Sequence, residues 1–211
     1  MILETESPIP VVTDTLPVME HFYTLQGEGF HQGRAAYFVR LGGCDVGCVW
    51  CDVKESWNAN AHPVIKVSDI IHATKQTPAK LVVVTGGEPL MHDLNFLTTS
   101  LQAEGFETNI ETSGAYPLNG NWNWICVSHK KFKAPLPSVL KEANELKVII
   151  FNKSDFDWAE RHASLVNTSC RLYLQPEWSQ AEKMSPLIVD YIMQHPEWEL
   201  SLQVHKYLNI P

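Results

Sequence analysis

The stretch GGCDVGCVWCD at residues 42–52 follows an apolar run, Ala36–Leu41, that is typical of a β-strand. Cys44, Cys48 and Cys51 stand in it at the spacing C-x3-C-x2-C. Glycines before and between the cysteines allow the loop to wrap around a compact object. Three thiolates at this spacing can bind three corners of a 4Fe–4S cluster, which leaves the fourth iron open to another ligand. The stretch therefore predicts an iron–sulfur loop at the end of a strand.

Zinc binding and an inert loop are the two alternatives for these cysteines. A structural zinc site takes four ligands, and here the fourth would have to be a distant histidine. Chance does not readily place three of a chain's five cysteines in one short loop. The other two, Cys126 in a predicted strand and Cys170 at the start of one, are interpreted as small buried apolar side chains.

Strand and helix signals alternate on the C-terminal side of this loop. The alternation predicts an α/β protein with a parallel sheet, helices outside it, and about six to seven parallel strands, which is an incomplete barrel. Ser68, Ser154 and the pair Ser179 and Glu182 are expected to cap helices. The predicted strands are 36–41, 81–85, 107–112, 124–128, 145–151, 171–175 and 200–205, and the predicted helices are 68–75, 93–104, 138–143, 154–166 and 179–194.

Composition limits the class of protein. The 211 residues are 45% hydrophobic and 19% charged, as in a globular domain, and the formal net charge of −8 argues against a nucleic-acid partner. The longest apolar run, Leu81–Val84, is too short to span a membrane. No Lys or Arg precedes Arg34, so we expect a cytoplasmic chain with reduced cysteines. The acidic, proline-rich residues 1–19 predict an N-terminal extension, and residues 20–211 a single domain.

A second motif lies after the next predicted strand. Thr85-Gly86-Gly87-Glu88-Pro89 follows the apolar run, and by itself it could be only a tight turn. Together with C-x3-C-x2-C and an aromatic residue, Trp50, before the last cysteine, it resembles the radical S-adenosylmethionine (SAM) superfamily. This resemblance implies that SAM chelates the open iron through its amino and carboxylate groups. One electron from the cluster then splits SAM into methionine and a 5′-deoxyadenosyl radical.

Further segments narrow the resemblance to the 7-carboxy-7-deazaguanine synthase family, from about residue 20 to the C-terminus. That family converts 6-carboxy-5,6,7,8-tetrahydropterin to 7-carboxy-7-deazaguanine with loss of ammonia, on the route to 7-deazapurines such as queuosine. The resemblance also implies a truncated, modified radical-SAM barrel, a homodimer and an external one-electron donor. The segments are FYTLQGEG at 22–29, FVRL at 38–41, IETSG at 110–114, VSHK at 127–130, LQP at 174–176 and HKYLNIP at 205–211.

The resemblance assigns one set of residues to the pterin. The amide of Gln26 can offer both a donor and an acceptor to the ring, and the guanidinium of Arg40 suits a bidentate contact with the substrate carboxylate. A plain loop residue is the alternative for Gln26, and an ion pair with Glu28 or another acid is the alternative for Arg40. The implied substrate residues are Leu25, Gln26, Gly27, Arg40, Thr85 and Pro211, the last through its carboxylate.

A second set is assigned to SAM and the cluster. His129 stands at a position where the family usually has proline. His205 lies in the terminal HKYLNIP segment, and it could also be a packed core histidine. The basic run 129–133 could suggest RNA, but the net charge favours a solvated or cofactor-facing loop. The implied SAM residues are Trp50, Cys51, Asp52, Gly87, Ser113, Ser128, His129, Lys130, Leu174, Gln175, Pro176 and Glu177, with Cys44, Cys48 and Cys51 on the cluster.

Val53 is an informative departure from the family pattern. The family often has threonine there, and its hydroxyl binds Mg²⁺. Valine has no oxygen, whereas Mg²⁺ requires oxygen ligands, so Mg²⁺ would depend on substrate oxygens, water or Asp52.

Two other function classes explain part of the pattern. A glycyl-radical activase would also carry the cysteine loop, but it must admit a protein loop, and the QGEG and HKYLNIP segments argue against that. A non-enzymatic zinc or iron–sulfur scaffold would leave GGEP and QGEG without a use.

Overall fold

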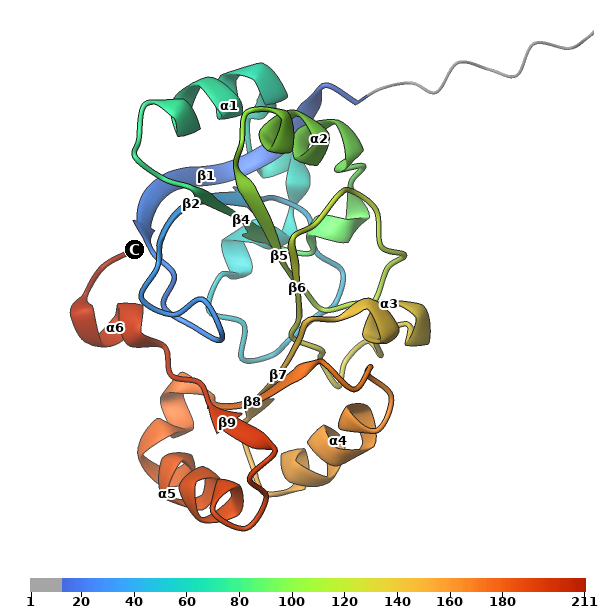
Figure 1. Ribbon diagram of the computed structural model, residues 1–211, viewed down its shortest axis with the longest axis vertical. Helices are drawn as coiled ribbons and strands as arrows, with labels where there is room; N and C mark the ends of the chain where they lie inside the picture. Colours follow the sequence, from blue (N-terminus) through green and yellow to red (C-terminus); the bar gives the residue numbers. More distant parts are fainter. Residues whose placement is uncertain (1–12) are drawn as a thin grey trace, which may run out of the picture.

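The computed structural model describes residues 13–211, and its framework is one sheet in the strand order β3-β1-β2-β4-β5-β6-β7-β8-β9 (Figure 1). Strand β2 and strands β4 to β9 run parallel, whereas β1 is antiparallel to both of its neighbours. The sheet does not close on itself, which confirms the predicted incomplete barrel. The strands are β1 Thr15–Leu25, β2 Ala35–Leu41, β3 Val64–Lys66, β4 Leu81–Gly86, β5 Glu107–Thr112, β6 Trp124–Val127, β7 Glu145–Ile150, β8 Arg171–Pro176 and β9 Trp198–Leu200.

Helices follow the parallel strands and pack on the outer face of the sheet. One large core lies between the two layers, where Leu97 and Leu101 of α2 join Val82 and Val84 of β4. Between residues 13 and 211, no helix has both the length and the apolar content needed to cross a bilayer. The α-helices are α1 Val67–Lys75, α2 Asn95–Ala103, α3 Pro137–Glu142, α4 Ser154–Ala163, α5 Ala181–Ile192 and α6 Val204–Leu208, and the short 3-10 turns are η1 Lys54–Trp57, η2 Ala59–Ala61, η3 Pro89–Met91 and η4 Trp178–Gln180.

The three predicted serine caps are wrong. Helix α1 begins one residue before Ser68, and Ser154 is already the first residue of α4. The hydroxyl of Ser179 donates to Glu177 from within a 3-10 turn, so it forms no capping box with Glu182. Nearby carboxylate and amide acceptors compete for these hydroxyls, as is usual for serine near a turn.

Both ends of the sequence differ from the predicted elements. Strand β1 begins at Thr15, inside the stretch interpreted as an extension, and residues 1–12 lie outside the described residues. The predicted strand 200–205 is wrong, because β9 ends at Leu200 and the chain then turns into α6. An irregularity in the β1–β2 pairing between Val18 and Glu20 interrupts the alternation that would have marked β1 as a strand.

Side-chain alternation along the strands gives the sheet an apolar outer face and an inner face where polar groups lie beside a small apolar cluster of Ala36, Leu81 and Val83. In β7, Leu146, Val148 and Ile150 belong to the core beneath the helices. Lys147 and Ile149 point the other way and line a cavity. The inside of this incomplete barrel therefore carries the functional groups, at the end where the parallel strands terminate.

The open edges of the sheet are joined by the QGEG loop and the C-terminal segment. The Gly27 carbonyl accepts from Val204 N at 3.0 Å, and Gly29 N donates to the Ser201 hydroxyl at 3.0 Å. A Cβ on Gly27 would lie 2.3 Å from His205 Nδ1, so glycine is required for this close approach. Loop contacts replace the strand pairing that would close a complete barrel.

Candidate active site

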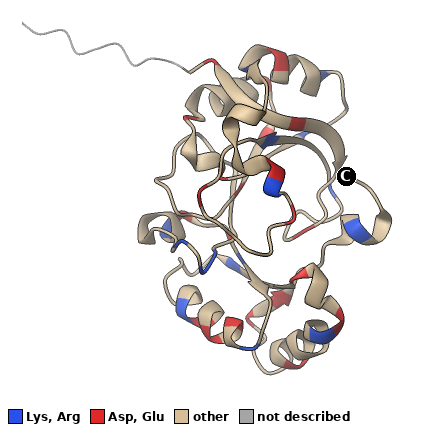
Figure 2. Ribbon diagram, turned by 180° about the vertical axis from the view of Figure 1, so that it is seen from behind, with Lys and Arg blue, Asp and Glu red and all other residues tan. Residues whose placement is uncertain are grey.

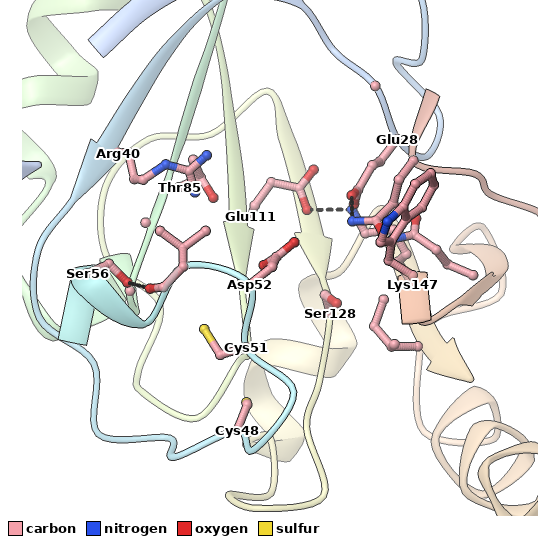
Figure 3. Close-up of a pocket in the computed structure, with 18 of the residues that line it drawn as sticks. Glu28, Arg40, Cys48, Cys51, Asp52, Ser56, Thr85, Glu111, Ser128 and Lys147 are labelled. Atoms are coloured by element: carbon pink, nitrogen blue, oxygen red, sulfur yellow. Dashed lines mark hydrogen bonds and ion pairs between the residues drawn. The ribbon is translucent and has the colours of Figure 1, made fainter. Parts of the chain in front are cut away.

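A cavity of about 270 Å³ opens on the inner face of the sheet, at the carboxyl ends of the strands (Figure 3). The cysteine loop forms one wall, and the QGEG loop with the C-terminal segment forms another. The residues that line it and that the sequence had assigned are Leu25, Gln26, Gly27, Arg40, Cys44, Cys48, Trp50, Cys51, Asp52, Thr85, Gly87, Ser113, Ser128, Lys130, Gln175, Pro176, Glu177 and Pro211.

The cysteine loop is held by backbone hydrogen bonds to its neighbours. Gly43 N donates to the Ser56 carbonyl at 2.6 Å, and Cys44 N donates to the Trp57 carbonyl at 3.1 Å. Glu88 N donates to the Gly43 carbonyl at 2.8 Å, which joins the loop to the GGEP turn. These bonds fix the loop from both sides.

Glu88 is the buried anchor of the GGEP turn. One carboxylate oxygen accepts from the Thr112 hydroxyl at 2.6 Å and from Leu90 N at 3.1 Å. The other accepts from Ser113 N at 2.8 Å and from the Ser113 hydroxyl. The turn is thus tied to the end of β5, and the Ser113 hydroxyl proton is already committed to a protein acceptor.

The donor set fits an iron–sulfur cluster. Cys44, Cys48 and Cys51 line the same cavity as free thiols, whereas Cys126 is buried within β6. Burial raises the pKa of Cys48 to about 11, so its thiol gives up a proton only when a cation compensates the thiolate. Three soft ligands on one wall, with open space beside them, match a cluster that keeps one iron free for a small molecule.

The segment after β6 turns alternate side chains to opposite sides. Ser128 and Lys130 face the cavity, where the Lys130 ammonium donates to the Ser128 hydroxyl at 2.7 Å and lies 5.3 Å from the Trp50 ring centre. His129 does not line the cavity and instead packs against the rings of Trp158 and His162. Any SAM contact of His129 is therefore left to its backbone. Leu174 is likewise absent from the lining and is fully buried in the core.

Arg40 combines the two roles considered for it. It lines the cavity near Thr85, and its Nε donates to the Glu20 carboxylate of the neighbouring strand at 2.6 Å. The partner is Glu20 and not Glu28. Because the pair engages Nε, the terminal nitrogens remain able to form a fork with a carboxylate.

A buried charge network lies deeper in the cavity. The Lys147 ammonium contacts the Glu28 carboxylate at 2.6 Å and the Glu111 carboxylate at 3.0 Å. Gln26 Nε2 donates to Glu111 at 3.2 Å, and Gln203 Nε2 donates to Glu28 at 2.9 Å. Burial alone would raise the pKa of Glu28, but Lys147 and Gln203 outweigh burial and lower it to about 2.

The C-terminal segment reaches over the mouth of the cavity. Lys206 of α6 contacts the Asp52 carboxylate at 3.0 Å, which links this segment to the residue after the last cysteine. The Thr24 hydroxyl donates to the Pro211 carbonyl at 3.2 Å, so residue 211 lies beside the end of β1. Figure 1 shows the C-terminus at this position.

Comparison with known proteins agrees with this arrangement. A family model described as a 4Fe-4S single cluster domain matches residues 25–125, which include the three cysteines. A 7-carboxy-7-deazaguanine synthase from Flavobacterium psychrophilum is 59% identical over 199 residues, covering 94% of each chain. The chain belongs to the 7-carboxy-7-deazaguanine synthase family.

Other members of this family support the same relationship. A 7-carboxy-7-deazaguanine synthase from Synechocystis is 48% identical and covers 95% of this chain and 96% of its own. The crystal structure of QueE from Escherichia coli has a TM-score of 0.82 and 33% identity, and the match covers 90% of this chain and 95% of that one. The likeness therefore extends over most of both chains.

Within this synthase framework, the charge network is what sequence reasoning missed. The sequence had assigned no substrate or cofactor contact to Glu28, Glu111, Lys147 or Gln203. One signal was present, because Lys147 is a charged residue inside the otherwise apolar end of β7, and a lysine is almost never fully buried without a partner. The identity of its partners required the fold.

Proposed function

We propose that this chain converts 6-carboxy-5,6,7,8-tetrahydropterin to 7-carboxy-7-deazaguanine with loss of ammonia, as a radical SAM enzyme of 7-deazapurine biosynthesis. The observation that carries the proposal is the meeting of three free thiols, Arg40 and the Gln26 amide around one cavity. The identity of 59% to a named synthase supports the same reaction. A reduced cluster with SAM supplies a radical that abstracts hydrogen, and the chain supplies binding and orientation.

Arg40 is proposed to bind the substrate carboxylate. Its Nε is held by Glu20, which fixes the plane of the guanidinium before substrate arrives. A fixed fork loses less conformational freedom on binding than a mobile side chain would. The remaining proposed substrate residues, Leu25, Gln26, Gly27, Thr85 and Pro211, line the same cavity as Arg40.

SAM is proposed to lie between the cysteine loop and the ends of β6 and β8. Ser128 and Lys130 offer a hydroxyl and an ammonium there, and Gln175 offers an amide. The ammonium of Lys130 suits the carboxylate of an amino acid. The further proposed contacts are Trp50, Cys51, Asp52, Gly87, Ser113, Pro176 and Glu177, with the backbone alone of His129 and of Leu174.

The proposal also includes the oligomeric state, the compartment and the source of electrons. We infer a homodimer in the cytoplasm that receives single electrons from an external donor and needs no nucleic-acid partner. In Figure 2 acidic and basic residues are mixed along the helices at the bottom of the view, and the formal net charge of the chain is −8.

Anaerobic turnover with the carboxy-tetrahydropterin, SAM and a chemical reductant tests the function. We expect 7-carboxy-7-deazaguanine and ammonia in equal amounts. The Cys48→Ala variant should lose iron and product, whereas Cys126→Ala, which alters a cysteine outside the cavity, should keep both. Methionine release without the deazaguanine would favour another radical SAM reaction, and zinc in place of iron would favour a scaffold.

We propose that Mg²⁺ binds as an accessory ion, at a site weakened because Val53 replaces the family's threonine. Val53 lines the cavity but offers no side-chain oxygen, and Asp52 is engaged by Lys206. Since Mg²⁺ readily keeps its waters, loss of one protein ligand reduces affinity without abolishing activity. Val53→Thr should therefore lower the Mg²⁺ concentration needed for half-maximal stimulation. Identical titration curves for the two proteins would show that position 53 is not at the ion.

A further inference from the structure

The buried lysine of β7 has no part in the reaction described so far. Its side chain is 3% exposed, although a buried ammonium is costly unless it is fully paired. The two carboxylates that pair with it come from distant segments, Glu28 from the QGEG loop and Glu111 from the end of β5. Figure 3 shows the three side chains converging beside the cavity.

We propose that Lys147 is a positioning residue: it holds Glu28 and Glu111 on either side of its ammonium group and, through Glu111, fixes the amide of Gln26 toward the pterin. This inference rests on the proposed function and deepens it, because it names the residue that orients the Gln26 amide for contact with the pterin ring.

The hydrogen bonds around Gln26 carry the argument. Its Nε2 donates to Glu111 at 3.2 Å, and its Oε1 accepts from Glu28 N at 3.1 Å. Only one orientation of the amide satisfies both bonds. One N–H and one lone pair of Gln26 then remain for a ligand, on a side chain that is 4% exposed.

The charge of the network also suits the ligand. One ammonium between two carboxylates leaves a net charge of −1 and acceptor lone pairs beside the cavity. A pterin presents an amino group and a ring N–H along one edge, and both are hydrogen-bond donors. A carboxylate held ionised is a stronger acceptor for such an edge than a neutral acid.

Lys147 keeps Glu28 in the ionised form. Burial favours the protonated acid, and the pKa is nevertheless about 2 because Lys147 lies beside it. Without the ammonium, burial would dominate and raise the pKa of Glu28. The ionisable groups that face Lys147 or Glu28 are Glu111, Glu145, Cys126, Lys130 and His205.

The test compares the pterin dissociation constant of the wild type with that of Lys147→Met and Lys147→Arg, under anaerobic conditions, between about pH 5.5 and 8. Wild-type Glu28 stays ionised over this range. In Lys147→Met we expect at least tenfold weaker binding, with a ratio to wild type that grows as the pH falls, because Glu28 becomes protonated. Lys147→Arg should remain closer to wild type, and Lys80→Met, which removes an exposed lysine, should not change binding.

A second comparison tests the proposal even if Lys147→Met does not fold. The double variant Lys147→Met/Glu28→Gln removes one of the two carboxylates that lose their partner, and it is compared with Glu28→Gln alone. We expect the double variant to bind at least tenfold more weakly, since Glu111 and Gln26 have lost the ammonium. Equal binding by these two proteins, or a Lys147→Met ratio that is the same at every pH, would overturn the proposal. Failure of the wild type to bind the pterin would instead reject the proposed function on which it rests.

Discussion

At the residue scale, His129 combines deep burial with no hydrogen-bond partner. It is 2% exposed, and neither ring nitrogen has a partner among the described residues. Its ring lies 4.1 Å from that of His162 and 5.4 Å from that of Trp158, centre to centre. The residue thus acts as an aromatic anchor that lets its neighbours, Ser128 and Lys130, face the cavity.

Acid should therefore weaken the fold through His129. Burial first, and then the nearby His162 and Lys130, lower the pKa of His129 well below 6.5. The unfolded chain takes up a proton near that value and the folded protein does not, so stability falls as the pH drops below about 6.5, by up to about 1.4 kcal/mol per pH unit. Urea unfolding at several pH values should show this slope, with a smaller slope in His129→Phe.

A matched variant separates the two histidines. The pKa of His162 is also lowered by burial, although its Nδ1 bonds to the Trp158 carbonyl at 2.8 Å. His162→Phe should therefore reduce the slope less than His129→Phe does. Equal slopes in wild type and His129→Phe would mean that His129 does not titrate upon unfolding.

At the scale of elements, the GGEP turn and the cysteine loop form one unit. A Cβ on Gly87 would lie 2.2 Å from the Gly43 carbonyl oxygen and 2.8 Å from the Cβ of Cys44. Backbone atoms of a held loop cannot yield cheaply at such distances. The absence of a side chain at residue 87 therefore serves the packing of the loop as well as any approach of SAM.

Gly87→Ala should impair iron uptake along with stability. The extra methyl group pushes the cysteine loop away, and overpacking of this kind typically costs about 1–3 kcal/mol. Iron per chain after anaerobic reconstitution and the urea midpoint measure the two effects. Gly105→Ala is the control, because it strains a positive φ of 84° in a turn with open space around it. It should lose stability and keep its iron, and normal iron content in Gly87→Ala would contradict the argument.

The elements that the sequence predicted well are those decided by local patterns. The parallel strands β2 and β4 to β8 are short apolar runs with turn signals around them, and the cysteine motif lies within one loop. Strand β1 was missed because the irregularity between Val18 and Glu20 interrupts its alternation. The short strand β3 was also missed, and the start of α6 was assigned to a strand. The pairs of Arg40 with Glu20 and of Lys147 with Glu28 join distant segments, so no local pattern could reveal them.

At the scale of the whole molecule, Ser201 joins the two open edges of the sheet. It is 1% exposed, its hydroxyl accepts from Gly29 N at 3.0 Å, and it donates to Gln175 Oε1 at 2.7 Å. One side chain thus connects the QGEG loop, β8 and the C-terminal segment.

Ser201→Ala should loosen this closure. It leaves a donor and an acceptor without partners, which typically costs about 1–3 kcal/mol. Urea unfolding gives the cost, and hydrogen exchange at Gly29 should become faster. Ser185→Ala removes a hydroxyl that bonds only within its own helix at 2.6 Å, so it should have a smaller effect and leave Gly29 protected. Unchanged exchange at Gly29 in Ser201→Ala would show that the edges are held by other contacts.

The contacts between the QGEG loop and the C-terminal segment also order events during folding. Gly27 and Val204 lie far apart in the sequence, and strands β2 to β9 lie between them along the chain. Pairing of neighbouring strands involves much shorter loops and has a smaller closure cost, so it comes earlier. We therefore expect a folding chain to assemble most of its sheet before the cavity is complete, so that catalytic competence is among the last properties to form.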